Sequence, residues 1–155
     1  MPAATEGETM TTDSNGFRLH LENEMPAAPE RVFEALTDPE RLKQWWGPNG
    51  FTTPQIDLDL RVGGAYRFTM QPPEGERFHL RGEFREIEPP KRIAYTFEWE
   101  EPAPGDVETL AVLTLRDLGG STELVLDQGE FTTEERLELH RGGWSEALEK
   151  LRQAL

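Results

Sequence analysis

Few side chains in this sequence have the type and spacing needed for metal, phosphate or covalent chemistry. The chain contains three histidines and no cysteine, which excludes disulfides, thiolate nucleophiles and cysteine-ligated metals. His20, His79 and His140 lie in three separate segments, and no His-x-x-x-His pair occurs. No glycine-rich phosphate loop follows an expected strand. We therefore expect no metal site and no cofactor.

His140 and Tyr95 are the two residues that could transfer protons inside the molecule. His140 shares the apolar stripe of a C-terminal helix with Leu137 and Trp144, so its imidazole is expected to face the interior. Such an imidazole is either a core residue with satisfied hydrogen bonds or a polar group that orients a ligand or exchanges a proton. With Tyr95 on an inward strand position, the pair would suit a cyclase or an isomerase.

Strands are the main elements that position these residues. Residues 17 to 25 alternate apolar and polar side chains, which predicts a strand with one wet face. Pro29 and Asp38-Pro39 then begin two short helices. From residue 54 the alternation returns, and turn-forming residues separate six strands that follow one another as an antiparallel meander. The expected inward residues of the meander are Ile56, Leu58, Leu60, Tyr66, Phe68, Met70, Phe78, Leu80, Phe84, Ile93, Tyr95, Phe97, Trp99, Ala111, Leu113, Leu115, Leu124 and Leu126.

A long helix closes the sequence. Thr132 and Glu135 have the spacing of a capping box, which predicts that the helix begins there. Two glycines, Gly142 and Gly143, interrupt its apolar stripe, and each weakens a helix interior by about 1 kcal/mol relative to alanine. We expect a close backbone approach or a bend to offset them.

This order of elements predicts an α+β, helix-grip fold. A curved antiparallel sheet of about seven strands would wrap around the long C-terminal helix, with two short helices after the first strand. One helix is narrower than such a sheet, so an apolar pocket is expected between the two layers. Residues 16–155 would form this domain, and residues 1–15 a flexible polar tail.

Inward aromatic side chains are the candidates for the wall of that pocket. Any one of them is more often a core residue, but so many rigid rings are hard to pack between a sheet and one helix without leaving gaps. The sequence predicts binding of a small hydrophobic or aromatic ligand, such as a lipid, rather than hydrolysis. The candidate ligand-binding residues are Trp46, Tyr66, Phe68, Phe84, Tyr95, Phe97, Trp99, Leu113, His140, Trp144 and Leu148.

Trp45 and Trp46 are adjacent on the second short helix. Neighbouring helical positions point about 100° apart, so at least one of the two rings is expected to miss the core and lie near the surface. The pair would serve either as a pocket lid or as an anchor of the short helix.

Five segments resemble the activator of heat-shock protein 90 ATPase homologue family, which belongs to the START-like (SRPBCC) superfamily. The resemblance covers about residues 17 to 155 and implies the helix-grip fold and a hydrophobic ligand. The superfamily includes lipid carriers, hormone receptors, polyketide cyclases and co-chaperones. The resemblance thus also implies a possible weak contact with a chaperone and a role in stress response. The segments are WWGPNGF (45–51), LRVGGAYRF (60–68), GEFREIEPPKRIAYTFEW (82–99), GGSTELVL (119–126) and HRGGWSEALEKL (140–151).

The charge of the chain limits its partners. Thirty acidic and 16 basic side chains give a formal net charge of −14. This acidic protein is poorly suited to nucleic acids or anionic membrane surfaces, which attract clustered Lys and Arg. No stretch is long and apolar enough for a membrane span, so a cytoplasmic location is expected. The oligomeric state is left open.

Overall fold

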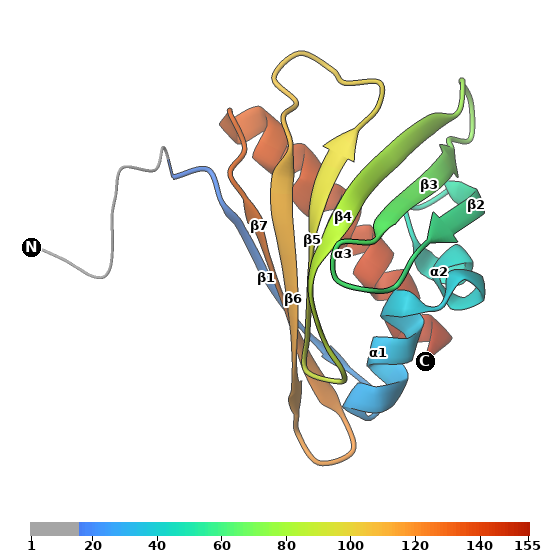
Figure 1. Ribbon diagram of the computed structural model, residues 1–155, viewed down its shortest axis with the longest axis vertical. Helices are drawn as coiled ribbons and strands as arrows, with labels where there is room; N and C mark the ends of the chain where they lie inside the picture. Colours follow the sequence, from blue (N-terminus) through green and yellow to red (C-terminus); the bar gives the residue numbers. More distant parts are fainter. Residues whose placement is uncertain (1–15) are drawn as a thin grey trace, which may run out of the picture.

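The computed structural model describes residues 16–155, which form an antiparallel sheet with a long helix across one face (Figure 1). The prediction of an α+β helix-grip fold is confirmed. The predicted tail of residues 1–15 lies outside the described residues. The elements are β1 (Leu19–Met25), α1 (Pro29–Thr37), α2 (Pro39–Trp45), β2 (Thr52–Leu58), β3 (Ala65–Gln71), β4 (Phe78–Glu88), β5 (Arg92–Trp99), β6 (Thr109–Asp117), β7 (Thr122–Gly129) and α3 (Glu134–Ala154).

The sheet is a meander to which the first strand has been added at the far edge. The strand order is β1-β7-β6-β5-β4-β3-β2, and every neighbouring pair is antiparallel. A register shift between Phe84 and Glu86 marks a β-bulge in β4. Beyond it the strand continues in a new register with β5, and this change explains why Glu86 does not continue the inward set.

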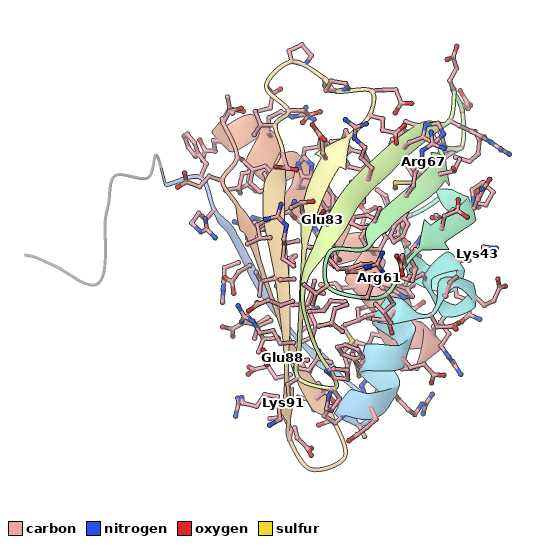
Figure 2. The ribbon with its side chains drawn as sticks, in the orientation of Figure 1. Lys43, Arg61, Arg67, Glu83, Glu88 and Lys91 are labelled. Atoms are coloured by element: carbon pink, nitrogen blue, oxygen red, sulfur yellow. The ribbon has the colours of Figure 1, made fainter. Side chains whose placement is uncertain are left out.

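Two layers enclose the core. α3 runs across the inner face of the sheet, with α1 and α2 beside it at one end (Figure 1). α3 packs against β1 and α2, while the central strands lie farther from its backbone. Charged side chains such as Arg67 and Glu83 stand on the outer face (Figure 2). This alternation places the apolar half of each strand beneath the helices. None of the described helices has the length and hydropathy needed to cross a membrane.

Side-chain caps fix where two of the helices begin. The Asp38 carboxylate accepts the Arg41 backbone N–H at 3.0 Å and caps α2. The cap of α3 is Thr133, which accepts the Arg136 N–H at 3.1 Å. The predicted capping box at Thr132 is therefore wrong by one residue, because the Thr132 hydroxyl donates instead to the Gly105 carbonyl.

Two further predictions about exposure are wrong. Leu60 is 42% exposed, because β2 ends at Leu58 and the alternation does not extend into the turn that follows. Trp45 and Trp46 are both buried, although at least one was expected at the surface. α2 ends at Trp45, and the extended backbone of Trp46 (φ −64°, ψ 135°) turns the second ring inward as well. The 100° rule applies only within a helix.

Candidate ligand-binding cavity

A cavity of about 600 Å³ lies between α3 and the sheet. Its walls come from the α2–β2 connection, strands β3 to β5, the β5–β6 connection and the middle of α3. Its volume falls within the roughly 300–1,000 Å³ range of small-molecule sites. The residues that line it are Trp46, Gly47, Pro48, Phe51, Met70, Phe78, Phe97, Trp99, Glu101, Ala103, Asp106, Arg136, Glu138, Leu139, His140, Gly142, Gly143, Trp144, Glu146 and Ala147.

Aromatic rings form most of the wall, and they support one another. The Trp46 and Trp144 rings meet edge to face with centroids 5.2 Å apart, and Phe97 meets Trp99 in the same way at 5.3 Å. Phe78 contacts Trp99 at 5.4 Å. Such edge-to-face contacts stabilise aromatic clusters beyond simple burial. The wall is therefore rigid as well as apolar.

His140 is held in the wall by hydrogen bonds to both of its ring nitrogens. The Trp99 indole N–H donates to Nε2 at 3.0 Å, and Nδ1 lies 2.7 Å from the Arg136 carbonyl oxygen. Since an indole only donates and a carbonyl only accepts, the proton is assigned to Nδ1 of a neutral imidazole. Burial lowers the pKa of His140, although the hydrogen bond to Arg136 opposes this shift. The geometry is that of a fixed neutral group whose two nitrogens are both engaged.

A buried ion pair closes the end of the cavity under the β5–β6 connection. Arg136 Nε and Nη2 lie 2.9 Å and 2.8 Å from Asp106 Oδ1, and the two side chains are only 15% and 7% exposed. Asp106 Oδ2 also accepts the Ala103 N–H at 2.8 Å. These bonds tie the connection to α3. The Arg136 charge is thereby matched by a carboxylate from the protein itself.

A second hydrogen-bond chain holds Trp144 from behind. Its indole N–H donates to Gln128 Oε1 at 2.7 Å, and Gln128 Nε2 donates to the Thr109 hydroxyl at 2.9 Å. Gln128 is completely buried. A fully satisfied buried network of this kind fixes side-chain orientation. The position of the Trp144 ring in the cavity wall is therefore set by polar contacts from β7.

Gly142 and Gly143 leave a notch in the helical wall. Apart from chain neighbours and the helix backbone, no heavy atom of the described residues lies within 4 Å of a Cβ placed at Gly142. At Gly143 the nearest atom would be Pro48 Cγ at 3.6 Å, an ordinary contact. Of the two expected reasons for these glycines, a close approach or a bend, the close approach is thus not found at Gly142. Packing does not require these glycines, and what they provide is open space beside the cavity.

The predicted site residues fall into three groups. Trp46, Phe97, Trp99, His140 and Trp144 line the cavity. Tyr66, Phe68, Phe84 and Tyr95 surround a separate space of about 10 Å³, which Trp46 also borders. Leu113 and Leu148 line neither space and are fully buried in the core.

The two proton-transfer candidates are therefore not brought together in one cavity. Tyr95 borders the small space and His140 the large one. Burial raises the pKa of the Tyr95 hydroxyl far above its ordinary value, which keeps the phenol protonated.

Several lining residues were not among the predicted site residues. Phe78 and Met70 were expected to face inward, but parity alone did not separate them from core residues. Phe51 lies in a connection, outside any periodic pattern. The glycine pair was the clearest available signal, because glycines inside an amphipathic helix need a structural reason.

His79, Glu100 and Glu101 form the one group in the described part of the chain whose ligand atoms could share a metal ion. These atoms lie within 4.8 Å of one another. Both carboxylates already have partners: Glu100 accepts two hydrogen bonds from Arg67 at 2.8 and 2.9 Å, and Glu101 accepts from His79 at 2.7 Å. The arrangement is that of a surface ion-pair network.

Comparisons with known proteins agree with this architecture. Residues 26–155 match the family model described as Activator of Hsp90 ATPase homolog 1-like protein. A crystal structure of a Chromobacterium violaceum protein is 29% identical, with a TM-score of 0.81 over 89% of this chain and 96% of that one. The AHSA1 protein of Silicibacter pomeroyi is 32% identical, with a TM-score of 0.77 over 88% and 96% of the two chains. Comparison with curated proteins gives no significant match.

The family match covers most of the described residues and both layers of the fold. It includes all elements from α1 to α3, and therefore every residue that lines the cavity. The fold is commonly a ligand-binding one. The chain belongs to the Activator of Hsp90 ATPase homolog 1-like family, within the START-like superfamily of helix-grip proteins.

Proposed function

We propose that this protein binds a small hydrophobic or aromatic molecule in the cavity between α3 and the sheet. The observation that carries the proposal is the cavity of about 600 Å³ and its aromatic wall. Among the described residues, six aromatic side chains line it: Trp46, Phe51, Phe78, Phe97, Trp99 and Trp144.

The energetics of the wall favour an occupant. The cavity is large enough for water and opens to solvent past exposed residues such as Leu139. An apolar ligand that enters it therefore gains by removing the apolar wall, as well as its own surface, from contact with water.

The polar groups of the wall do not oppose an apolar ligand. Both nitrogens of His140 and the Arg136–Asp106 pair find their partners within the protein. A ligand that displaces water from His140 leaves neither ring nitrogen unpaired, and at Arg136 it meets a charge that Asp106 already neutralises. We assign the direct contacts to Trp46, Phe97, Trp99, His140 and Trp144. Tyr66, Phe68, Phe84, Tyr95, Leu113 and Leu148 form the packed layers that hold this wall.

The first experiment is native mass spectrometry of the purified protein, followed by denaturation and identification of any released compound. A second measurement follows the melting temperature against a library of lipids and aromatic compounds. A ligand at 100 times its Kd stabilises the folded state by about 2.7 kcal/mol. No bound compound and no change in melting temperature with any library member would overturn the proposal.

A matched pair of α3 variants locates the site. Ala147→Leu adds a larger side chain at a buried lining position, whereas Ser145→Leu adds the same side chain on the exposed face. We expect Ala147→Leu to weaken ligand stabilisation at least about tenfold in Kd, or about 1.4 kcal/mol, and Ser145→Leu to leave it unchanged. Equal binding by both variants would place the ligand outside the cavity.

A further inference from the structure

We infer that the cavity prefers amphipathic cations, in which an apolar or aromatic body carries an ammonium group, over amphipathic carboxylates such as fatty acids. This inference rests on the proposed function and adds the chemical class of the ligand's polar end. It follows from the charges that border the cavity and from the rings that line it.

The charged residues of the lining are mostly acidic. The described residues that line the cavity include four acidic side chains, Glu101, Asp106, Glu138 and Glu146, and one Lys or Arg, which is Arg136. Arg136 and Asp106 neutralise each other in the buried pair. Three glutamates remain, and all three are partly or largely exposed. The charge that a ligand meets at the edge of the cavity is therefore negative.

Glu146 is the least compensated of the three. Its carboxylate accepts the Asn49 backbone N–H at 2.9 Å, a neutral donor. The nearby cation is Lys150, whose ammonium donates to the Pro48 carbonyl oxygen at 3.2 Å. No ion pair to Glu146 within 4.0 Å occurs in the described part of the chain. Glu146 is thus available to a cationic ligand group.

The two other glutamates have partners that weaken but do not remove their charge. Glu138 lies 3.2 Å from Arg141, in a pair that is 54% and 39% exposed and therefore screened by solvent. Glu101 accepts from His79, which is a cation only when protonated. All three glutamates border the aromatic wall rather than the packed half of the core.

The aromatic rings of the wall also attract cations. The faces of tryptophan and phenylalanine rings carry negative electrostatic potential and attract ammonium groups. Trp46, Trp99 and Trp144 all line the cavity. A cationic ligand can therefore keep its charge beside the glutamates at the edge while its body contacts the rings.

Among the described residues, the lining offers an anionic ligand no cation whose charge is uncompensated. Nε and Nη2 of Arg136 are bound by Asp106, which is only 7% exposed. A ligand carboxylate would meet a guanidinium whose charge Asp106 already neutralises, so it gains little attraction from Arg136. The net charge of −14 also repels anions from the molecule as a whole.

Three probes with one alkyl chain test the inference: decyltrimethylammonium, decanol and decanoate, each titrated calorimetrically below its micelle concentration. We expect the ammonium to bind at least about tenfold more tightly than the carboxylate, with the alcohol between them. Added salt should reduce the difference, because the glutamates are exposed.

A charge-matched pair of variants separates the site from the general charge of the protein. Glu101→Gln with Glu146→Gln removes two charges at the cavity, and Glu24→Gln with Glu88→Gln removes two on exposed strand positions away from it. The ratio of ammonium to decanol affinity should fall several-fold in the first variant and hold in the second. Because each ratio is taken within one variant, a partial loss of the cavity cancels.

The outcomes distinguish the inference from the proposed function. Decanoate binding as tightly as the ammonium, or an equal fall of the ratio in both variants, overturns the cation preference. If decanol still binds, the hydrophobic-ligand function stands. Failure of all three probes to bind overturns the cation preference, whereas the proposed function is decided by the library of lipids and aromatic compounds.

Discussion

The interior of this protein has two halves that differ in how they are filled. Around Tyr66, Phe84 and Tyr95 the space left is about 10 Å³, whereas between α3 and Trp99 about 600 Å³ stays open. The same sheet, with the same alternation, forms the floor of both halves. The difference lies in the opposite layer, where Leu36 and Leu42 of α1 and α2 fill one half and the glycine notch of α3 faces the other.

Trp46 divides the two halves and belongs to both. Its ring meets Phe68 at 4.9 Å on the filled side and Trp144 at 5.2 Å on the hollow side. The covering helices, and not the sheet, therefore determine where a pocket forms.

The largest expected effect comes from removing a ring in the filled half. Phe84→Ala should lower the free energy of unfolding by about 3–5 kcal/mol, because Phe84 is 4% exposed and tightly surrounded. Phe78→Ala removes the same ring from the edge of the hollow half, where Phe78 is partly exposed, and should lower it by less than about half as much. Urea unfolding followed by circular dichroism gives both values. Equal losses would contradict the looser packing of the hollow half.

Two glycine substitutions should change the stability of the fold in opposite directions. A Cβ at Gly82, in the filled half, would collide with the Thr96 carbonyl oxygen and the Tyr66 ring. Gly82→Ala should therefore destabilise the fold by about 1–3 kcal/mol. Gly142→Ala meets no neighbour and should stabilise it by about 0.5–1 kcal/mol. Thermal unfolding of both variants decides the point, and a destabilised Gly142→Ala would show that the notch is not open.

The hollow half depends on hydrogen bonds for the position of its wall. Gln128→Leu should lower the free energy of unfolding by about 1–3 kcal/mol, because the Trp144 indole loses its buried acceptor. Trp144→Phe in the same background should restore part of that loss, since no indole donor then remains. An additive double-mutant cycle would contradict the network.

The smallest effect is a pH dependence carried by His140. Burial lowers the pKa of His140 in the folded state, so below about pH 6.5 the unfolded chain takes up the proton first. Stability should therefore fall as pH decreases from about 6.5 toward the folded-state pKa, and His140→Gln should remove this slope. Urea midpoints between about pH 5 and 8 measure it. A wild-type slope that persists in His140→Gln would assign the titration elsewhere.

His20, on the outer surface, provides a control, because its effect on stability should change with pH in the opposite direction. Hydrogen bonds to Asp127 and Glu22 raise the pKa of His20. Its contribution to stability is thus present below about pH 6.5 and is lost as pH rises through the folded-state pKa. His20→Gln should therefore lower the free energy of unfolding at acidic pH and leave it unchanged above the folded-state pKa of His20.

The fold could be predicted from the sequence because the strands alternate apolar and polar residues and α3 carries one apolar stripe. The apolar face of the sheet and this stripe are both buried when they pack against each other. The failures occur where periodic elements end. Leu60 continues the parity of β2 but lies past its last residue, and Trp46 follows α2 with an extended backbone. Periodicity describes the inside of an element and not its ends.

The site was only partly readable for a different reason. Tyr95 and Trp99 share one face of β5, but only Trp99 borders the large cavity. Parity tells which face a side chain occupies and not how far the opposite layer stands from it. That separation depends on α1, α2 and the notch at Gly142, so it follows from tertiary packing.

The placement of the tryptophans gives the molecule an optical reporter of its own cavity. Of the four tryptophans, Trp46, Trp99 and Trp144 line it, and the fourth, Trp45, is 5.4 Å from Trp46 between ring centroids. Nearly all intrinsic emission therefore originates at or beside the cavity wall. An occupant that quenches indoles or excludes water from them changes the emission of the whole protein, so occupancy can be followed by light without a label.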